Sequence, residues 1–167
     1  MKALYSLSRH IAGFDFFPWL VMQAAHGATE VVFDIRKPST KKWPLETVMR
    51  RFESILLPGP ALLGLPCSIG TEGKQLAPYH QADLVRLVRA GMKVPRLKSV
   101  LPAGDERYTV TLRRTERSPG RNSRENDWRD FAAEIGALVI EDYDVDPIHL
   151  HERMALYAGA EMNFFVT

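Results

Sequence analysis

The chain has 167 residues, of which 46% are hydrophobic, so it is long enough for one ordinary domain or two very small ones with a real core. Its 22 Lys and Arg residues nearly balance its 20 Asp and Glu residues, and a net charge of +2 is far from the strongly basic balance of a general nucleic-acid binder. Cys67 is the single cysteine, which excludes an internal disulfide framework and a cysteine-based zinc site. Because the net charge is so small, any positively charged site must be confined to a small part of the surface.

The sequence also bears on the compartment of the protein. The longest strongly apolar stretch, residues 16–25, is about half as long as a membrane span requires. Ser8, Arg9 and His10 interrupt the apolar core that a signal peptide would need. These features predict a cytoplasmic protein with an intact N-terminus and no membrane span, and a single cysteine suits a reducing compartment.

The first half of the chain is expected to alternate strands and helices. The helix behind Pro44 is the clearest, because its apolar residues recur at helical spacing. The expected elements are strands at 3–7, 29–35 and within 61–70, and helices at 15–26, 44–57 and 79–91. The strand within 61–70 is expected to be buried, and Leu84, Leu87 and Val88 are expected to face inward from the last helix.

Residues 93–106 contain two prolines and a glycine without a sustained period. They are expected to link an N-terminal half, 1–92, to a C-terminal half, 107–167, unless the two halves merge into one sheet. The second half follows the order strand, helix, strand, helix, strand. Its expected elements are strands at 107–113, 137–142 and 162–167, a helix that begins after Asn122 or Ser123 with Glu125 in a capping box and ends at Gly136, and a helix that Pro147 opens with Leu150, Met154, Tyr157 and Ala158 facing inward.

Strands that alternate with helices predict a mostly parallel sheet with helices on both faces, which is a Rossmann-like α/β fold. Such sheets bind ligands beyond the carboxyl ends of their strands. Four arginines gather at one such end, after the strand at 107–113: Arg113, Arg114, Arg117 and Arg121. Together with the N–H groups and dipole of the following helix, guanidinium groups form a site for phosphate or pyrophosphate.

The roles expected within this arginine cluster differ. Successive strand residues point to opposite faces, so at most one of Arg113 and Arg114 is expected to belong directly to the pocket. Arg117 and Arg121 could close over the anion from the loop, and Asn122 and Ser123 could add donors. The alternative is that the loop arginines are solvated charges, which pair with nearby acids at about 0–1 kcal/mol per pair. These acids are Glu116, Glu125 and Asp127.

Acidic and imidazole groups raise the question of a metal. Four acids follow the strand at 137–142, and they could coordinate a divalent ion or bind a ribose, although a solvated loop is the preferred interpretation: Glu141, Asp142, Asp144 and Asp146. His149 and His151 are two residues apart on a helix, so they cannot share a face as an i, i+4 ligand pair does. No metal site is therefore expected.

Several segments together resemble a known family. "TLRRTE", "RNS", "VIEDYD" and "ERMALYAGAEMNFFVT" follow one another as in the donor-binding half of GT-B glycosyltransferases and related bacterial proteins of surface-polysaccharide synthesis. "VTLRRTER" is similar to the arginine-bearing strand motif of fucosyltransferase-like members, and residues 4–36 resemble the opening strand-helix-strand of the same transferases. The resemblance implies a partial GT-B fold in which Arg113 and Arg114 take the positions of the motif's paired arginines. One arginine of that motif engages the pyrophosphate of a sugar nucleotide.

The resemblance also implies an activity. The protein would transfer the sugar of a nucleotide-diphosphate sugar to a hydroxyl of a glycan or other acceptor, without a metal or a further cofactor. Acceptor activation in such enzymes needs a base near the strand ends of the first domain, which indicates His10 or Asp15. Asp15 is also a candidate helix cap.

The length and surface chemistry of the chain define the alternatives. A two-domain enzyme of this kind needs about 300 residues, so a shortened or partner-dependent form is expected. The alternative function is that of a catalytically incomplete homologue, which acts as a binding or assembly protein and forms a homo-oligomer over an exposed sheet edge. No partner nucleic acid is expected, because no basic stripe with interleaved aromatics flanks the arginines.

Overall fold

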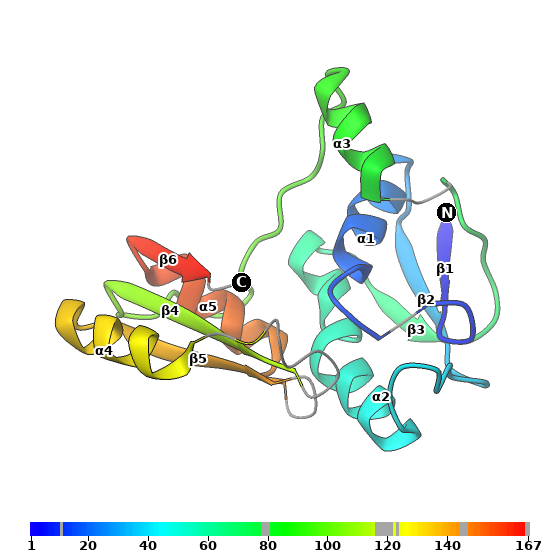
Figure 1. Ribbon diagram of the computed structural model, residues 1–167. Coiled ribbons are helices and arrows are strands. Elements are labelled where there is room, and N and C mark those ends of the chain that lie inside the picture. Colours follow the sequence, from blue (N-terminus) through cyan, green and yellow to red (C-terminus); the bar gives the residue numbers. More distant parts are fainter. Residues whose placement is uncertain (11, 78–80, 116–121, 123, 144–146, 166–167) are drawn as a thin grey trace. The chain divides into compact units, whose positions relative to one another are not determined.

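The computed structural model describes the chain except for residues 11, 78–80, 116–121, 123, 144–146 and 166–167, and except for the side chains of residues 81, 82 and 142. The chain divides into two compact units, Met1–Lys98 and Ser99–Thr167, and each has its own three-stranded parallel sheet (Figure 1). The boundary between the units lies within residues 93–106, which form neither helix nor strand. The two units are described separately below.

The N-terminal unit carries a sheet with the strand order β1-β2-β3. Its strands are β1 (Lys2–Ser6), β2 (Glu30–Asp34) and β3 (Cys67–Ile69). Its helices are α1 (Phe16–Ala25), α2 (Leu45–Arg51), the π-helical turn η1 (Phe52–Leu56), the 3-10 turn η2 (Gly59–Leu63) and α3 (Gln81–Arg89). The helix predicted at 44–57 is therefore α-helical only as far as Arg51 and continues as a π-helical turn.

Aromatic side chains hold the N-terminal unit together. Tyr5 and Phe33 are partners in the β1–β2 register, so they point to the same face of the sheet. Tyr5 packs edge-on against Trp19 of α1, with ring centroids 4.8 Å apart, and Phe33 packs edge-on against Phe52 of η1 at 5.3 Å. The connections from β1 to β2 and from β2 to β3 therefore cover one face of this sheet.

Two burial predictions for this unit are wrong. All three residues of β3 are exposed, because β3 is a short strand at the edge of the sheet. Val88 of α3 is 44% exposed, while Leu84 and Leu87 are half-buried. α3 packs against α1 rather than on the sheet, so its inward stripe is narrower than the periodicity predicts.

The C-terminal unit carries a sheet with the order β5-β4-β6, in which β4 is central. Its elements are β4 (Tyr108–Arg114), α4 (Glu125–Ile135), β5 (Leu138–Tyr143), α5 (Leu150–Gly159) and β6 (Met162–Phe165). α4 ends at Gly136 in the left-handed conformation, with φ 65°. Pro147 lies before the first residue of α5, and Ala158 of α5 is exposed rather than inward.

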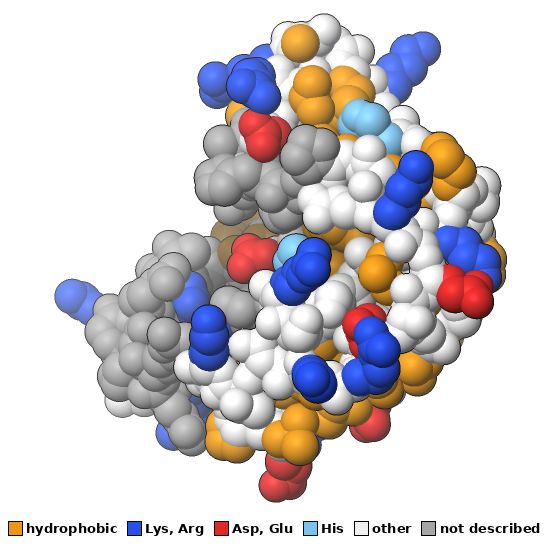
Figure 2. Space-filling model, turned by 90° about the vertical axis from the view of Figure 1, so that its right-hand side faces the viewer, with side chains coloured by type: hydrophobic (Ala, Val, Ile, Leu, Met, Phe, Trp, Pro, Cys, Tyr) orange, Lys and Arg blue, Asp and Glu red, His pale blue; other side chains and the backbone are white. Residues whose placement is uncertain are grey.

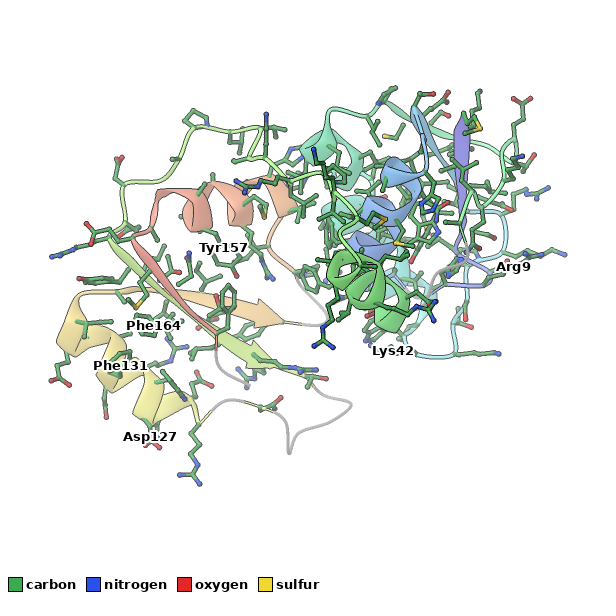
Figure 3. All side chains as sticks on the ribbon, turned by 90° about the horizontal axis from the view of Figure 1, so that it is seen from above. Arg9, Lys42, Asp127, Phe131, Tyr157 and Phe164 are labelled. Carbon is green, nitrogen blue, oxygen red and sulfur yellow. The ribbon has the colours of Figure 1, made fainter. Side chains whose placement is uncertain are left out.

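The two helices of the C-terminal unit lie on opposite faces of its sheet (Figure 3). On the α4 face, Phe131 packs edge-on against Phe164 at 5.2 Å, and both surround the buried Val110 and Leu112 of β4. On the α5 face, the hydroxyl groups of Thr111 and Tyr157 lie 3.0 Å apart. An apolar layer and a polar layer thus cover the two sides of β4.

The polar layer under α5 is a hydrogen-bonded network. The Thr109 hydroxyl donates to the Asn163 side-chain oxygen at 2.6 Å, and the Asn163 amide donates to the Tyr157 carbonyl at 3.2 Å. Thr109 is fully buried and Thr111 is buried. Since buried polar groups are costly without partners, this network fixes α5 on the sheet through its geometry.

The α/β fold class with parallel sheets and flanking helices is confirmed, and each unit is consistent with part of a Rossmann-like fold. The arrangement of helices on both faces holds for the C-terminal unit. In the N-terminal unit, α1 and η1 share a face. Among the helices that the structure describes, none combines the length and apolar character that crossing a bilayer requires.

Candidate functional site

The first candidate site lies where β4 and β5 end. These strands are neighbours, but the chain leaves β4 toward α4 on one face and leaves β5 toward α5 on the other. Open α/β sheets bind ligands in the crevice beyond the carboxyl ends of their strands, and in the order β5-β4-β6 the strand order reverses between β4 and β6. This topology therefore favours a ligand beyond the carboxyl end of the central strand β4, and the lining residues show on which side of β4 a cavity lies.

A cavity of about 220 Å³ occupies this crevice. It is lined by Leu112, Arg113, Arg114, Asn122, Glu125 and Tyr143. The prediction that at most one of Arg113 and Arg114 belongs to the pocket is wrong. Because Arg114 is the last residue of β4, the cavity reaches around the end of the strand and takes both side chains.

Arg114 is oriented by an aromatic neighbour. Its guanidinium lies 5.3 Å from the ring centroid of Tyr143, its register partner on β5. Hydrogen bonding to Tyr143, with a further contribution from the carboxylates of Glu125 and Glu141, raises the pKa of Arg114. Arg114 is therefore a fixed, permanently charged group at the mouth of the crevice.

The acids around the cavity are engaged by a third arginine. Arg129 of α4 donates to Glu125 at 2.8 and 3.0 Å and also binds Glu141. Hydrogen bonds from Tyr143 and Arg129 lower the pKa of Glu141, so its carboxylate stays ionised. Arg129 thus engages Glu125, the acid among the described lining residues, and Arg113 and Arg114 bring two guanidinium groups to the cavity.

Asn122 lines the cavity, and the prediction that it caps the following helix is wrong. Its side-chain oxygen accepts a hydrogen bond of 2.7 Å from the backbone N–H of the buried Thr115, so it ties the end of the β4–α4 connection to the strand. α4 begins at Glu125 with Arg124 at the N-cap position, and no side chain that the structure describes caps it. The predicted capping box is therefore wrong. Arg117, Arg121 and Ser123 lie outside the described residues.

The second candidate site lies in the N-terminal unit, beyond the carboxyl ends of β1 and β2. A cavity of about 370 Å³ is lined there by Leu4, Ser6, Ser8, Arg9, His10, Asp34, Arg36, Thr71 and Gln75. The His10 ring stacks on Tyr5 with centroids 4.7 Å apart. Burial and the positive charge of Arg9 lower the pKa of His10, so its imidazole is neutral at pH 7.

An ion pair forms the opposite wall of this second cavity. Arg36 donates to the Asp34 carboxylate at 2.9 and 3.0 Å, and this hydrogen bonding lowers the pKa of Asp34 to about 2. Neither residue is among the site residues predicted from the sequence. The signal was present, because Asp34 ends the apolar strand "EVVFD", and a polar residue at a strand end is a site candidate in this fold class.

Asp15, the other predicted base, does not line the cavity that holds His10. It is exposed at the N-cap position of α1, and its side chain makes no capping hydrogen bond with a described residue. The two predicted bases are thus at different places in the loop before α1.

The described residues contain no cluster of side chains suited to a metal ion. Within the described part of the chain, no three His, Cys, Asp or Glu side chains converge as a metal ion would need. The His149 and His151 rings are 5.2 Å apart and perpendicular, and the His149 ring accepts from the His151 backbone N–H at the start of α5.

One face of the surface is mixed in charge. On the face of the molecule in Figure 2, the coloured Lys and Arg side chains stand in separate groups, with acidic and hydrophobic side chains between them.

Comparisons with protein-family models, with curated proteins and with solved structures gave no match for this chain. The geometry and chemistry of the two cavities are therefore the guide to the function.

Proposed function

We propose that the C-terminal unit binds the diphosphate of a sugar nucleotide in the crevice beyond β4 and β5. One observation carries the proposal: Arg113 and Arg114 both line the cavity beyond the carboxyl ends of β4 and β5. Guanidinium groups bind phosphate oxygens through paired, charge-assisted hydrogen bonds. A diphosphate offers two adjacent phosphates to two adjacent arginines.

The start of α4 supports the same ligand. No described side chain caps this helix, so N–H groups of its first turn are available to an anion, and the helix dipole favours negative charge there. The cavity, at about 220 Å³, is smaller than the roughly 300–1,000 Å³ typical of small-molecule pockets. It suits the charged part of a nucleotide better than the whole molecule.

The reaction we propose is transfer of the sugar to a hydroxyl group of a glycan or other acceptor. The bond between the anomeric carbon and the diphosphate oxygen breaks, and a bond from that carbon to the acceptor oxygen forms. The nucleoside diphosphate leaves with the bonding electrons, stabilised by the arginines, and the acceptor proton passes to a base. His10 and Asp15 are the candidates for this base that the sequence indicates, and His10 is the one that lines a cavity.

Calorimetric titration with a panel of nucleoside diphosphates tests the binding. Arg113→Gln and Arg114→Gln are each expected to weaken binding about tenfold or more, since a hydrogen bond to a charged group contributes roughly 1.5–3 kcal/mol. Arg107→Gln is the matched control, because Arg107 is exposed, pairs with Glu161 and precedes the opposite end of β4. Absence of binding by the wild type would remove the proposal.

A second candidate function, assembly with copies of the same chain, has one specific observation in its favour. β6 is an edge strand of its sheet, and its Met162 and Phe165 are 53% and 61% exposed. Exposed apolar edges are surfaces on which strands of another chain can pair. Light scattering that finds a strict monomer with an intact nucleotide site would exclude this candidate.

We propose the cytoplasm as the location. The exposed Cys67 is a free thiol, which a reducing compartment maintains.

A further inference from the structure

The cavity of the N-terminal unit has a composition that the proposed nucleotide site does not explain. Its lining combines three hydroxyl groups, an amide, an imidazole, two guanidinium groups and one carboxylate around a single apolar side chain, Leu4. Its volume of about 370 Å³ falls in the range of roughly 300–1,000 Å³ for small-molecule sites. Convergent polar groups of this kind select ligands by hydrogen bonding.

The charges in this cavity are unequal. The Asp34 carboxylate accepts hydrogen bonds from Nε and Nη2 of Arg36 and from the Arg36 backbone N–H at 3.2 Å. The charges of these two residues therefore largely offset each other. Arg9 is exposed and forms no ion pair with any residue that the structure describes. Its charge acts on the His10 imidazole in the same lining. The open positive charge of the cavity is therefore on the Arg9 and His10 side.

The loop that carries Arg9 and His10 is held in place before any ligand arrives. The backbone N–H of His10 donates to the Ser6 carbonyl at 3.0 Å, and that of Leu7 donates to the Asp34 carbonyl at 3.0 Å. Further along the loop, the buried Arg51 donates to the Ala12 carbonyl at 2.7 Å. A site that is already ordered loses less conformational entropy when a ligand binds.

Hydroxyl recognition comes from the other side of the cavity. The Ser6 and Ser8 hydroxyls lie 2.9 Å apart, so one of them donates to the other and the second can donate outward. Thr71 and Gln75 add a hydroxyl and an amide from the segment that runs beside β1, where Lys74 bridges to Ala3. The carboxylate of Asp34 can accept from a ligand hydroxyl through the lone pairs that Arg36 leaves.

We propose that this cavity is a second ligand site, which binds a small hydroxylated oxyanion: a molecule that carries a carboxylate or a phosphate beside its hydroxyl groups. The oxyanion would bind Arg9 and the His10 ring, and the hydroxyl groups would bind the serine, threonine, glutamine and aspartate side chains. The inference does not depend on nucleotide binding by the C-terminal unit.

Calorimetry on the full chain tests the proposal with three probes: glucuronate, glucose 6-phosphate and glucose. The two anions are expected to bind at least about tenfold more tightly than neutral glucose, the gain from a charge-assisted hydrogen bond. Their relative affinities then distinguish a carboxylate ligand from a phosphate ligand. Equal binding of glucose and the anions, or no binding of any probe, would overturn the proposal.

Variants locate the binding. Arg9→Gln is expected to weaken anion binding about tenfold and to leave glucose unchanged, whereas Lys41→Gln, the loss of another exposed charge in the same unit, is expected to change neither. The double variant Arg113→Gln and Arg114→Gln is expected to retain the anion site, which separates this proposal from the nucleotide site. Loss of glucose 6-phosphate and glucuronate binding in that double variant would assign the anion to the other unit.

A nuclear magnetic resonance titration of the His10 imidazole gives an independent readout. Tyr5 stacks on this ring, the charge of Arg9 acts on it, and Asp34 and Arg36 line the same cavity. An anion bound beside the ring favours the imidazolium, so glucuronate is expected to raise the pKa of His10. An unchanged pKa of His10 at saturating glucuronate would contradict contact between the anion and this ring.

Discussion

The two units have the same kind of sheet but differ in where their helices lie. In the C-terminal unit, the connections after the neighbouring strands β4 and β5 diverge to opposite faces, and the cavity between the strand ends holds two arginines. In the N-terminal unit, α1 and η1 cover the same face, and the cavity lies beside the loop after β1. The difference teaches that a cavity can form beyond the strand ends with either arrangement of helices, while the residues of the strand ends and loops decide its chemistry.

The interiors of the units differ as well. The N-terminal core contains the fully buried Phe16, Trp19, Phe33 and Phe52, whereas the aromatic residues of the C-terminal core, Trp128, Phe131 and Phe164, are only partly buried. Burial of apolar area is the main stabilising term, so the N-terminal unit is expected to be the more stable of the two.

Truncation of one core aromatic in each unit is expected to have the largest effect. Phe33→Ala removes a fully buried ring, which is expected to cost about 3–5 kcal/mol in the free energy of unfolding. Phe131→Ala removes a partly buried ring and is expected to cost roughly 1–3 kcal/mol. Urea unfolding followed by hydrogen exchange measures both. Equal losses would break the contrast between the two cores.

A close backbone contact in the C-terminal unit gives the next effect. A Cβ atom on Gly159 would overlap the carbonyl group of Gly104, which is backbone and cannot rotate away. Gly159→Ala is therefore expected to destabilise this unit by roughly 1–3 kcal/mol. Gly13→Ala is the control, because an added Cβ there meets no atom within 4 Å. Thermal unfolding that places Gly159→Ala at the wild-type midpoint would show that the segment near Gly104 does not pack on α5.

The polar layer under α5 predicts a smaller effect. Tyr157→Phe removes the hydroxyl that lies 3.0 Å from the Thr111 hydroxyl and keeps the ring. The expected cost is about 1 kcal/mol, the net contribution of one buried hydrogen bond. Chemical denaturation measures this cost. If Thr111→Val has a similar cost and the double variant loses less than the sum of the two single variants, the two hydroxyl groups interact.

The Asp34–Arg36 pair predicts a pH dependence with little effect on overall stability, since Arg36 is exposed. The pKa of Asp34 is lowered from 3.8 to about 2 by hydrogen bonding from Arg36. A carboxyl group whose pKa is lower in the folded state stabilises fully above pH 3.8 and loses that contribution as the pH falls toward 2. Arg36→Gln is expected to return the pKa of Asp34 toward 3.8 in an NMR titration, and Lys41→Gln is expected to leave it low. A pKa of Asp34 near 3.8 in the wild type would show that the pair does not form in solution.

The sequence was sufficient for the order of the elements. Apolar periodicity and the stop signals at Gly27 and Gly136 predict α1 and α4, and the runs around Val31 and Val110 predict β2 and β4. These are local properties, which neighbouring residues determine. Burial was less predictable where an element lies at an edge, as for β3 and Val88.

The candidate sites were only partly predictable because they depend on tertiary pairing. Arg113 and Arg114 follow from their place at the end of a strand, but their common cavity follows from the pairing of β4 with β5 and from the end of the strand at Arg114. The sequence predicts Asn122 as a helix cap, but its side-chain oxygen accepts a hydrogen bond from the Thr115 backbone N–H instead. Asp34 has a local signal as the last residue of the apolar strand β2, but its place in one cavity with Ser6 and His10 depends on the pairing of β1 with β2.

A crystal soak with a mixture of nucleoside diphosphates tests the central claim most directly, because it shows where phosphate binds. The account predicts electron density for two phosphate groups beyond the carboxyl ends of β4 and β5, within hydrogen-bonding distance of Arg113 and Arg114. Density for the phosphates elsewhere on the molecule, with the crevice empty, would contradict it.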